Sequence, residues 1–200
     1  MTGAVGRLRP GGRAARVRQS VLAATVTVVA EGGADAVRIG EIARQAGVHD
    51  SSIYRRWPTK EHLVFDALVD YNRDRLPIPD TGSLRTDLLA YLAMVTEYAA
   101  TPVGQAIVKA MVGTQDDAVM AAERAQFWQN RVERTRVMFD RAVTRGELAA
   151  DTDPVAALEL LTGALYFRLL LTRQPIDDNT TGHLIDVLVN GLAPVGSRSR

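Results

Sequence analysis

The sequence contains no cysteine among its 200 residues. Disulfide bonds, thiolate metal ligands and cysteine catalysis are therefore excluded. The sequence also lacks an uninterrupted apolar run of the roughly 20 residues that a membrane-spanning helix needs. Aromatic residues are scarce, at 6%, although the hydrophobic content of 46% is enough for a buried core. We therefore expect a globular protein of the reducing cytoplasm, with no membrane partner.

Net charge is also small, at +1, but the charges are unevenly distributed. Residues 1–60 contain ten Lys and Arg against four Asp and Glu, a net charge of +6, whereas residues 61–200 contain 14 against 19, a net charge of −5. A basic first part attracts phosphate electrostatically. Arginines between positions 7 and 18 supply five of its ten cations, so a solvated basic tail is an alternative source of the asymmetry.

Apolar residues recur at spacings of three and four, which predicts an all-α fold. Gly32-Gly33 and the segment 76–79, with Pro77 and Pro79, interrupt this periodicity. Nine helices are expected, at about 13–31, 38–46, 49–56, 59–75, 83–100, 103–113, 117–145, 153–173 and 179–192.

Residues 36–60 have the pattern of a helix-turn-helix. Ile39, Ile42 and Ala43 place an apolar stripe on a short helix. Gly47 permits a tight turn, and Ile53 anchors the next helix. The two helices are expected to cross at a steep angle.

The outward face of this second helix is small or polar. Asp50 and Tyr54 share one line along it, and Ser51 and Arg55 share the next. Small residues let a helix seat in a major groove, whereas Tyr and Arg can hold phosphates. The pattern predicts a DNA-recognition helix.

The same segment resembles the DNA-binding signature of TetR-family transcriptional regulators. The pattern is Ile42-Ala43-x-x-Ala46-Gly47-Val48-x-x-x-x-Ile53-Tyr54-x-x-Trp57-x-x-Lys60-Glu61-x-Leu63. The resemblance covers about residues 13–70. It implies that Asp50 and Ser51 face bases, and that a second set of residues holds the DNA backbone. That set is Ser52, Tyr54, Arg55, Arg56 and Lys60.

Two positions depart from the family pattern. Arg38 stands where the family often has Thr, which would exchange a hydroxyl–phosphate contact for a charged one, and His49 stands where Ser often caps the recognition helix. Asp50 is then a candidate for two roles, a base-reading residue or the helix cap. Trp57 is equally open as a core residue or a DNA contact. The predicted DNA-binding residues are Arg38, His49, Asp50, Ser51, Ser52, Tyr54, Arg55, Arg56 and Lys60.

The resemblance also implies an apolar ligand pocket among the later helices. Most aromatic and Met residues there are expected to be core. Arg168 lies in an apolar segment, and three roles are open for it. It binds an acidic ligand, or it pairs across a dimer interface, or its side chain extends to solvent. The candidate pocket residues are Tyr91, Met94, Tyr98, Met111, Trp128, Phe139, Tyr166 and Arg168.

The last two expected helices carry long apolar stripes that either pack inward or pair with a second subunit. The resemblance implies the second arrangement, a four-helix bundle in a twofold homodimer that presents two recognition helices to a palindromic site. The predicted interface residues are Leu158, Leu161, Leu165, Leu169, Leu184, Val187, Leu188 and Leu192.

Together these patterns predict a ligand-responsive DNA-binding regulator of operator DNA, a repressor or, with the same parts, an activator. Residues 13–58 are expected to bind DNA and residues 59–193 to sense an unknown small molecule and dimerise, between disordered tails at 1–12 and 194–200. A helical scaffold without specific DNA binding is the alternative. Because the three histidines are scattered, we expect no enzyme, no metal site and no cofactor.

Overall fold

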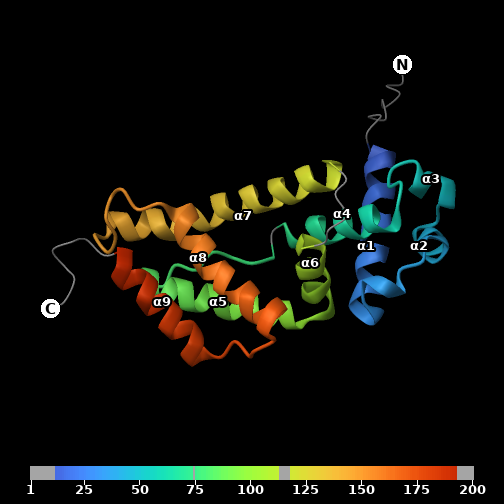
Figure 1. The fold of residues 1–200 in the computed structure, drawn as a ribbon. Helices are drawn as coiled ribbons and strands as arrows, with labels where there is room; N and C mark the ends of the chain where they lie inside the picture. Colours follow the sequence, from blue (N-terminus) through green and yellow to red (C-terminus); the bar gives the residue numbers. More distant parts are fainter. Residues whose placement is uncertain (1–11, 74, 113–117, 193–200) are drawn as a thin grey trace, which may run out of the picture. The chain divides into compact units, whose positions relative to one another are not determined.

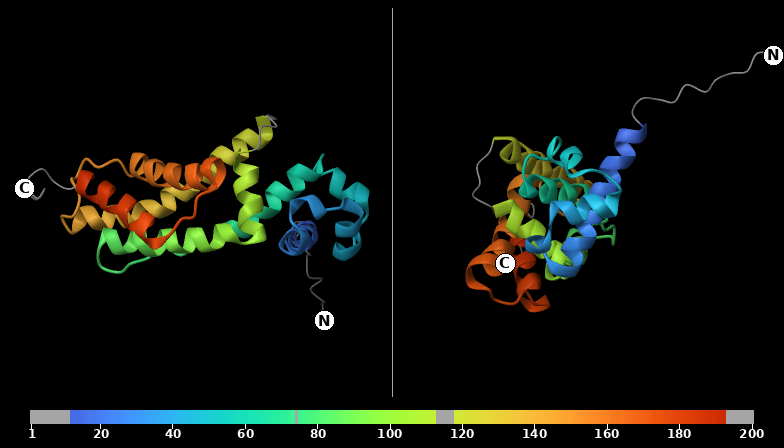
Figure 2. Two further views of the ribbon diagram at one scale, coloured as in Figure 1. Left: turned by 60° about the horizontal axis from the view of Figure 1, so that its bottom comes forward. Right: turned by 90° about the vertical axis from the view of Figure 1, so that its right-hand side faces the viewer.

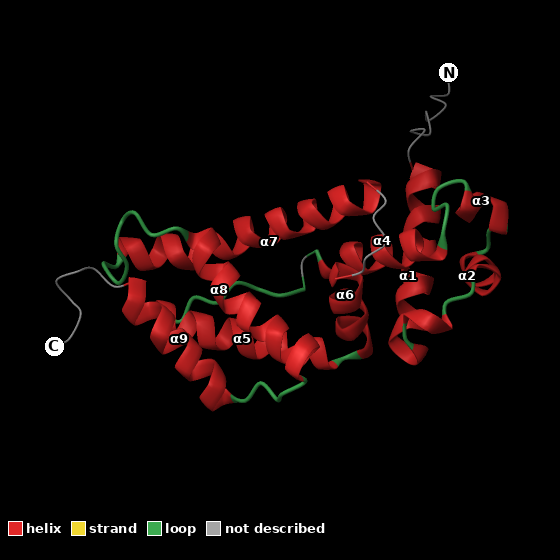
Figure 3. Cartoon of the chain, in the orientation of Figure 1, coloured by secondary structure: helices red, strands yellow, loops and turns green. Residues whose placement is uncertain are grey.

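A computed structural model describes residues 12–73, 75–112 and 118–192. Within these ranges the chain forms nine α-helices and no strand (Figures 1 and 3), which confirms the expected all-α fold. The helices are α1 (Gly12–Gly32), α2 (Ile39–Ala46), α3 (Asp50–Tyr54), α4 (Lys60–Asn72), α5 (Leu84–Ala100), α6 (Pro102–Val112), α7 (Ala118–Thr144), α8 (Pro154–Tyr166) and α9 (Asp178–Leu192).

The helix ends follow the local signals in the sequence. Pro102 and Pro154 are the first residues of α6 and α8, where the missing N–H costs nothing. Gly33, after α1, and Gly146, after α7, have φ values of 76° that favour glycine. The expected disordered tails lie outside the described residues, except that Gly12 begins α1. A short 3₁₀ turn, Ala34–Ala36, was not anticipated.

The first compact unit comprises the described parts of residues 1–75 and 99–115. In it α1 packs against α2, α4 and α6, so α4 and α6 share a core with the helix-turn-helix. Val21, Ile42, Ile53 and Phe65 are at most 1% exposed and form the centre of that core. The unit thus has its own buried interior.

The second compact unit comprises the described parts of residues 76–98 and 116–200. It contains α5, α7, α8 and α9, and α8 is in contact with α9, beside which it runs in the left view of Figure 2. Leu88, Met138 and Ile185 are fully buried and join three of these helices in one cluster, to which α8 contributes Leu161.

A buried carboxylate fixes the start of α5. Asp87 is 0% exposed and accepts hydrogen bonds from the Thr81 N–H at 2.6 Å and its hydroxyl at 2.7 Å, while a guanidinium nitrogen of Arg145 lies 3.7 Å away. Glu147 accepts the Leu84 N–H at 2.6 Å and also pairs with Arg145. These contacts tie α5 to the end of α7.

The helix expected at 153–173 changes form near its end. Regular α-helix stops at Tyr166, and Phe167–Thr172 forms a π-helical turn. The Arg168 guanidinium donates two hydrogen bonds to the Pro175 carbonyl, at 3.0 and 2.8 Å. By length and composition Pro154–Thr172 is apolar enough to cross a membrane. In the fold, however, Leu158, Leu161 and Leu165 from this segment pack into the core.

Candidate DNA-binding surface and ligand pocket

The turn between α2 and α3 has the expected geometry. Gly47 lies in the left-handed region, at φ 67° and ψ 37°. Its N–H donates to the Arg44 carbonyl at 3.3 Å, and the Val48 N–H donates to the Ala43 carbonyl at 2.9 Å. These bonds close the end of α2 and reverse the chain into α3.

Helix α3 presents a polar face to solvent, as its sequence predicts. Asp50, Ser51 and Arg55, which follows its last residue, are exposed, Tyr54 is 51% exposed and Ser52 is half-buried. These side chains are accessible to a DNA groove.

Neither candidate caps α3 through its side chain. The N-cap residue is His49, and its side chain makes no cap hydrogen bond in the described structure. Asp50 is already the first helical residue, so it does not occupy the capping position. The capping alternative for Asp50 is therefore wrong, and its exposed carboxylate remains available for another role.

Three cations follow this face along the chain. Arg55 and Arg56 are exposed, and the Arg56 guanidinium lies 5.4 Å from the centre of the Trp57 ring. Lys60 begins α4, directly after Thr59, whose hydroxyl caps the helix by accepting the His62 N–H at 3.3 Å.

Arg38, the first departure from the family pattern, is exposed and makes local contacts. Its Nη1 donates to the carbonyls of Asp35 at 2.6 Å and Val37 at 3.0 Å. The guanidinium therefore braces the 3₁₀ turn before α2, while its exposed edge remains open to a phosphate.

Trp57 belongs to the core and to a polar clamp beneath the recognition helix. It is 5% exposed, and its indole Nε1 donates to Asp66 Oδ2 at 2.9 Å. Arg18 donates to Asp66 Oδ1 at 2.6 Å and to Asp70 Oδ1 at 3.0 Å. The clamp, formed by Arg18, Trp57, Asp66 and Asp70, joins the end of the helix-turn-helix to α1 and α4.

The clamp holds Arg18 firmly charged. Burial opposes this charge, but the hydrogen bonds and attraction of Asp70 and Asp66 outweigh it and raise the pKa of the guanidinium. Sequence reasoning counted Arg18 only as part of a basic tail. Asp66 and Asp70 lie one helical turn apart, so one cation can reach both, but this spacing does not identify that cation as Arg18.

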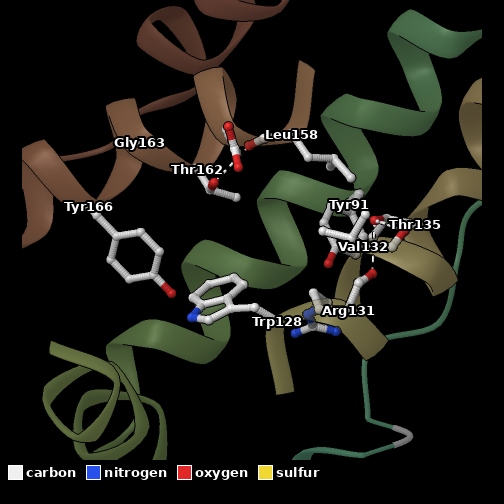
Figure 4. Close-up of a pocket in the computed structure, with 10 residues that line it drawn as sticks. Tyr91, Trp128, Arg131, Val132, Thr135, Leu158, Thr162, Gly163 and Tyr166 are labelled. Atoms are coloured by element: carbon white, nitrogen blue, oxygen red, sulfur yellow. Dashed lines mark hydrogen bonds between the residues drawn. The ribbon is translucent and has the colours of Figure 1, made fainter. Parts of the chain in front are cut away.

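A cavity of about 280 Å³ lies in the second unit, between α5, α7 and α8 (Figure 4). Tyr91 comes from α5, Trp128 and Arg131 from α7, and Thr162 and Tyr166 from α8. Trp128 and Tyr166 meet edge to face, with ring centres 5.8 Å apart, and the Arg131 guanidinium lies 5.8 Å from the centre of the Tyr91 ring.

Five predicted pocket residues do not line this cavity. Phe139 is 1% exposed within the core cluster, and Met94 and Tyr98 pack against that cluster. Met111 lies in α6 and belongs to the first unit. Arg168 is held by the Pro175 carbonyl. Apolar side chains at helical spacing mark the core and the cavity wall alike, so the sequence did not separate them.

The predicted interface stripe also needs correction. Leu158, Leu161, Leu165 and Leu188 are at most 7% exposed, because they pack inside the protomer, whereas Leu169, Leu184 and Leu192 are half-buried. Only Val187 of the predicted set is largely exposed. The large apolar side chains exposed in these helices and the π-helical turn are Leu160 (67%), Phe167 (54%), Leu171 (74%), Val187 (62%) and, at the start of α8, Val155 (43%).

A helix-turn-helix with an exposed polar recognition face, in one chain with a helical unit that holds an aromatic cavity, defines a DNA-binding regulator of transcription. Family comparison agrees with this class. The model described as "Bacterial regulatory proteins, tetR family" matches residues 21–67, and that described as "Tetracyclin repressor-like, C-terminal domain" matches residues 78–188. The chain belongs to the TetR family of transcriptional regulators, as its signature indicated.

Similar proteins extend over nearly the whole chain. The regulator AqdR of Rhodococcus erythropolis is 31% identical over 94% of this chain and 91% of its own length. The DNA-binding transcriptional repressor TetR of Mycobacteroides abscessus is 30% identical over 90% of this chain and 95% of its own. The crystal structure of the TetR-family regulator SCO0332 covers 90% of this chain and 100% of its own, with a TM-score of 0.77 and 31% identity.

A more distant structure shares the fold alone. RolR, solved in complex with resorcinol, is 15% identical, with a TM-score of 0.67 over 94% of this chain and 92% of its own. Regulators of this family bind operator DNA, act as dimers and bind small-molecule ligands.

Proposed function

We propose that this protein is a repressor that binds a palindromic operator as a homodimer and leaves it when a small molecule enters the cavity between α5, α7 and α8. The single observation that carries the DNA-binding part is the exposed polar face of α3, followed along the chain by cations and by the partly buried clamp. A ligand that binds better to the DNA-incompetent arrangement shifts the population away from the operator.

The contacts are assigned by chemistry. Ser51 and Asp50 face the bases, with Asp50 suited to accept a hydrogen bond from a cytosine amino group. Tyr54, Arg55 and Lys60 hold phosphates, and Lys60 gains from its place at the positive end of α4. Further contacts to the DNA backbone are assigned to Ser52, His49, Arg38 and Arg56.

The dimer is proposed to form through α8 and α9. Leu160, Phe167, Leu171 and Val187 expose large apolar surfaces there, and water-exposed groups of this kind favour association. The half-buried Leu169, Leu184 and Leu192 extend this surface. Two recognition helices are needed because one short helix makes too few contacts for tight, specific binding.

Salt-dependent binding tests the proposal. An operator is first located by genomic footprinting, and the affinity of Arg55→Gln and Lys60→Gln for it is then measured by fluorescence anisotropy at several salt concentrations. Each substitution removes two phosphate contacts from a dimer, so the slope of log affinity against log salt falls by about 2. Arg136→Gln, an exposed α7 variant, is the matched control and leaves the slope unchanged. A wild-type protein without preference for any duplex over random DNA contradicts the proposal.

A helical scaffold is the competing function. It shares the long helices but does not require the recognition face, and neutralising Arg55 leaves its partner bound. We also propose that the protein catalyses no reaction, since its family consists of regulators. Because its proposed target is chromosomal DNA, we also propose that the protein acts in the cytoplasm.

A further inference from the structure

We propose that the cavity between α5, α7 and α8 binds a planar aromatic carboxylate of one or two rings. This inference rests on the proposed function, because it names the ligand class of the sensing site. It is carried by three features of the cavity: its cation, its aromatic walls and its size.

The cation is Arg131, a half-buried guanidinium on the cavity wall. Within the described residues its guanidinium lies over the Tyr91 ring, and no carboxylate oxygen lies within the 4.0 Å of an ion pair. Glu159, the carboxylate at the cavity, is solvent-exposed and beyond that distance. A half-buried charge without a counter-ion favours an anionic guest, which restores the lost hydration by charge-assisted hydrogen bonds.

The other polar groups select a hydrogen-bond acceptor. The hydroxyls of Thr135 and Thr162 donate to carbonyls of their own helices, at 2.9 Å and 2.7 Å, so they are already occupied. The phenol hydroxyls of Tyr91 and Tyr166 have no hydrogen bond within the described structure. Burial raises the pKa of both phenols, so they remain protonated and donate. The two oxygens of a carboxylate have enough lone pairs to accept hydrogen bonds from the guanidinium and from a phenol at the same time.

The walls select a flat ring. Trp128 and Tyr166 stand edge to face at an interplanar angle of 83°, and Figure 4 shows their rings together at one end of the cavity. Val132 and Leu158 supply apolar surface at the opposite end. An aromatic guest gains from offset or edge-to-face contacts beyond the burial of its area, whereas a saturated ring gains burial alone.

The size limits the guest. A volume of about 280 Å³ lies at the lower end for small-molecule sites, which are about 300–1,000 Å³. One ring or two fused rings with a carboxylate suit such a space better than a long acyl chain, which it is too small to enclose.

Isothermal titration calorimetry on the full-length protein tests the proposal with three probes: 2-naphthoate, the uncharged 2-naphthamide and the saturated cyclohexanecarboxylate. Because hydrogen bonds to a charged group are the stronger kind, 2-naphthoate is expected to bind at least about tenfold more tightly than 2-naphthamide. It is also expected to bind more tightly than cyclohexanecarboxylate, which keeps the charge but lacks the aromatic contacts and buries less area. Equal binding of the acid and the amide, or no saturable binding of the acid, overturns the proposal without any variant being needed.

Arg131→Gln tests which residue reads the charge. It is expected to abolish the preference for the acid over the amide, whereas Arg136→Gln, five residues along the same helix, retains it. Arg131→Lys keeps the charge and so keeps a reduced preference, which provides the test where the Gln variant does not fold. An Arg131→Gln protein that melts like wild type and still prefers the acid contradicts the assignment.

Operator binding is measured on the same preparation. A protein that binds its operator but shows no preference for the acid overturns the ligand class alone. A protein that prefers 2-naphthoate but binds no operator overturns the proposed function and leaves the ligand class standing.

Discussion

The indole Nε1 of Trp57 donates a 2.9 Å hydrogen bond to Asp66 Oδ2, while the other oxygen of that carboxylate accepts from Arg18 at 2.6 Å. One carboxylate of α4 therefore accepts hydrogen bonds both from Trp57, three residues after the end of the recognition helix, and from a cation of α1. The recognition helix is only five residues long and has little stability of its own. Its orientation depends on what lies beneath it.

Asp66→Ala is expected to lower the free energy of unfolding by about 2 kcal/mol, because it leaves the buried indole N–H of Trp57 without its acceptor and leaves the partly buried Arg18 with Asp70 as its remaining carboxylate. Urea denaturation of the purified protein measures this loss. Asp140→Ala is the control, since its pair with Arg136 is exposed and is worth at most about 0.5 kcal/mol. Equal stability of the two variants contradicts the role of the clamp.

Gly47 and Gly40 are expected to respond to alanine with opposite signs. Gly47 has a φ of 67°, where a Cβ costs roughly 1 kcal/mol. Gly40 lies within α2, and a Cβ there meets Asp50 Oδ2 at an ordinary 3.5 Å. Gly40→Ala is therefore expected to stabilise the protein by about 0.5 kcal/mol. Thermal melting of both variants checks the pair, and a stabilised Gly47→Ala protein rules out the left-handed turn.

Stability is expected to fall at high pH through Tyr166. Burial raises the pKa of this phenol from 10.0 to about 12, and attraction to Arg131 only partly offsets the shift. A raised folded-state pKa gives stability that is complete below pH 10 and is lost between pH 10 and 12.

Urea denaturation at pH 8 and pH 11 measures this loss. Wild type is expected to lose about 1 kcal/mol more than Tyr166→Phe over that interval. The comparison with Phe isolates this phenol from the other groups that titrate in the same range. If wild type and Tyr166→Phe lose the same free energy of unfolding between pH 8 and pH 11, the raised pKa of this phenol is contradicted.

Val187→Arg is expected to convert the proposed dimer to a monomer. Val187 is 62% exposed on α9, and a charge placed inside an apolar interface is not compensated. Light scattering after gel filtration measures the mass. Val137→Arg, at a 41% exposed valine of α7, is the matched control and leaves the mass unchanged. If the Val187→Arg protein is still a dimer, the interface lies elsewhere.

The elements of the fold were predictable because their signals are local. Glycine and proline punctuate the helices where the chain must turn, and the three- to four-residue spacing of apolar residues defines each buried face. Gly47 with Ile42 and Ile53 specifies the helix-turn-helix without reference to the rest of the chain.

The interactions between elements were less predictable. Leu158 and Leu160 are equally apolar, yet one is buried in the protomer and the other is 67% exposed, since tertiary packing decides which side of α8 faces inward. Arg18 and Asp66 are 48 residues apart, so no local pattern pairs them. No pattern in the sequence indicated that Arg131 lies on the cavity wall.

The placement of the two tryptophans has a practical consequence. The sequence contains only two, and Trp57 lies beneath the recognition helix while Trp128 lines the cavity. Each compact unit therefore carries one tryptophan fluorophore. Replacing one tryptophan with Phe leaves the other as an optical reporter of its own unit. The arrival of a small molecule and the response of the DNA-binding unit can then be timed separately, without a label.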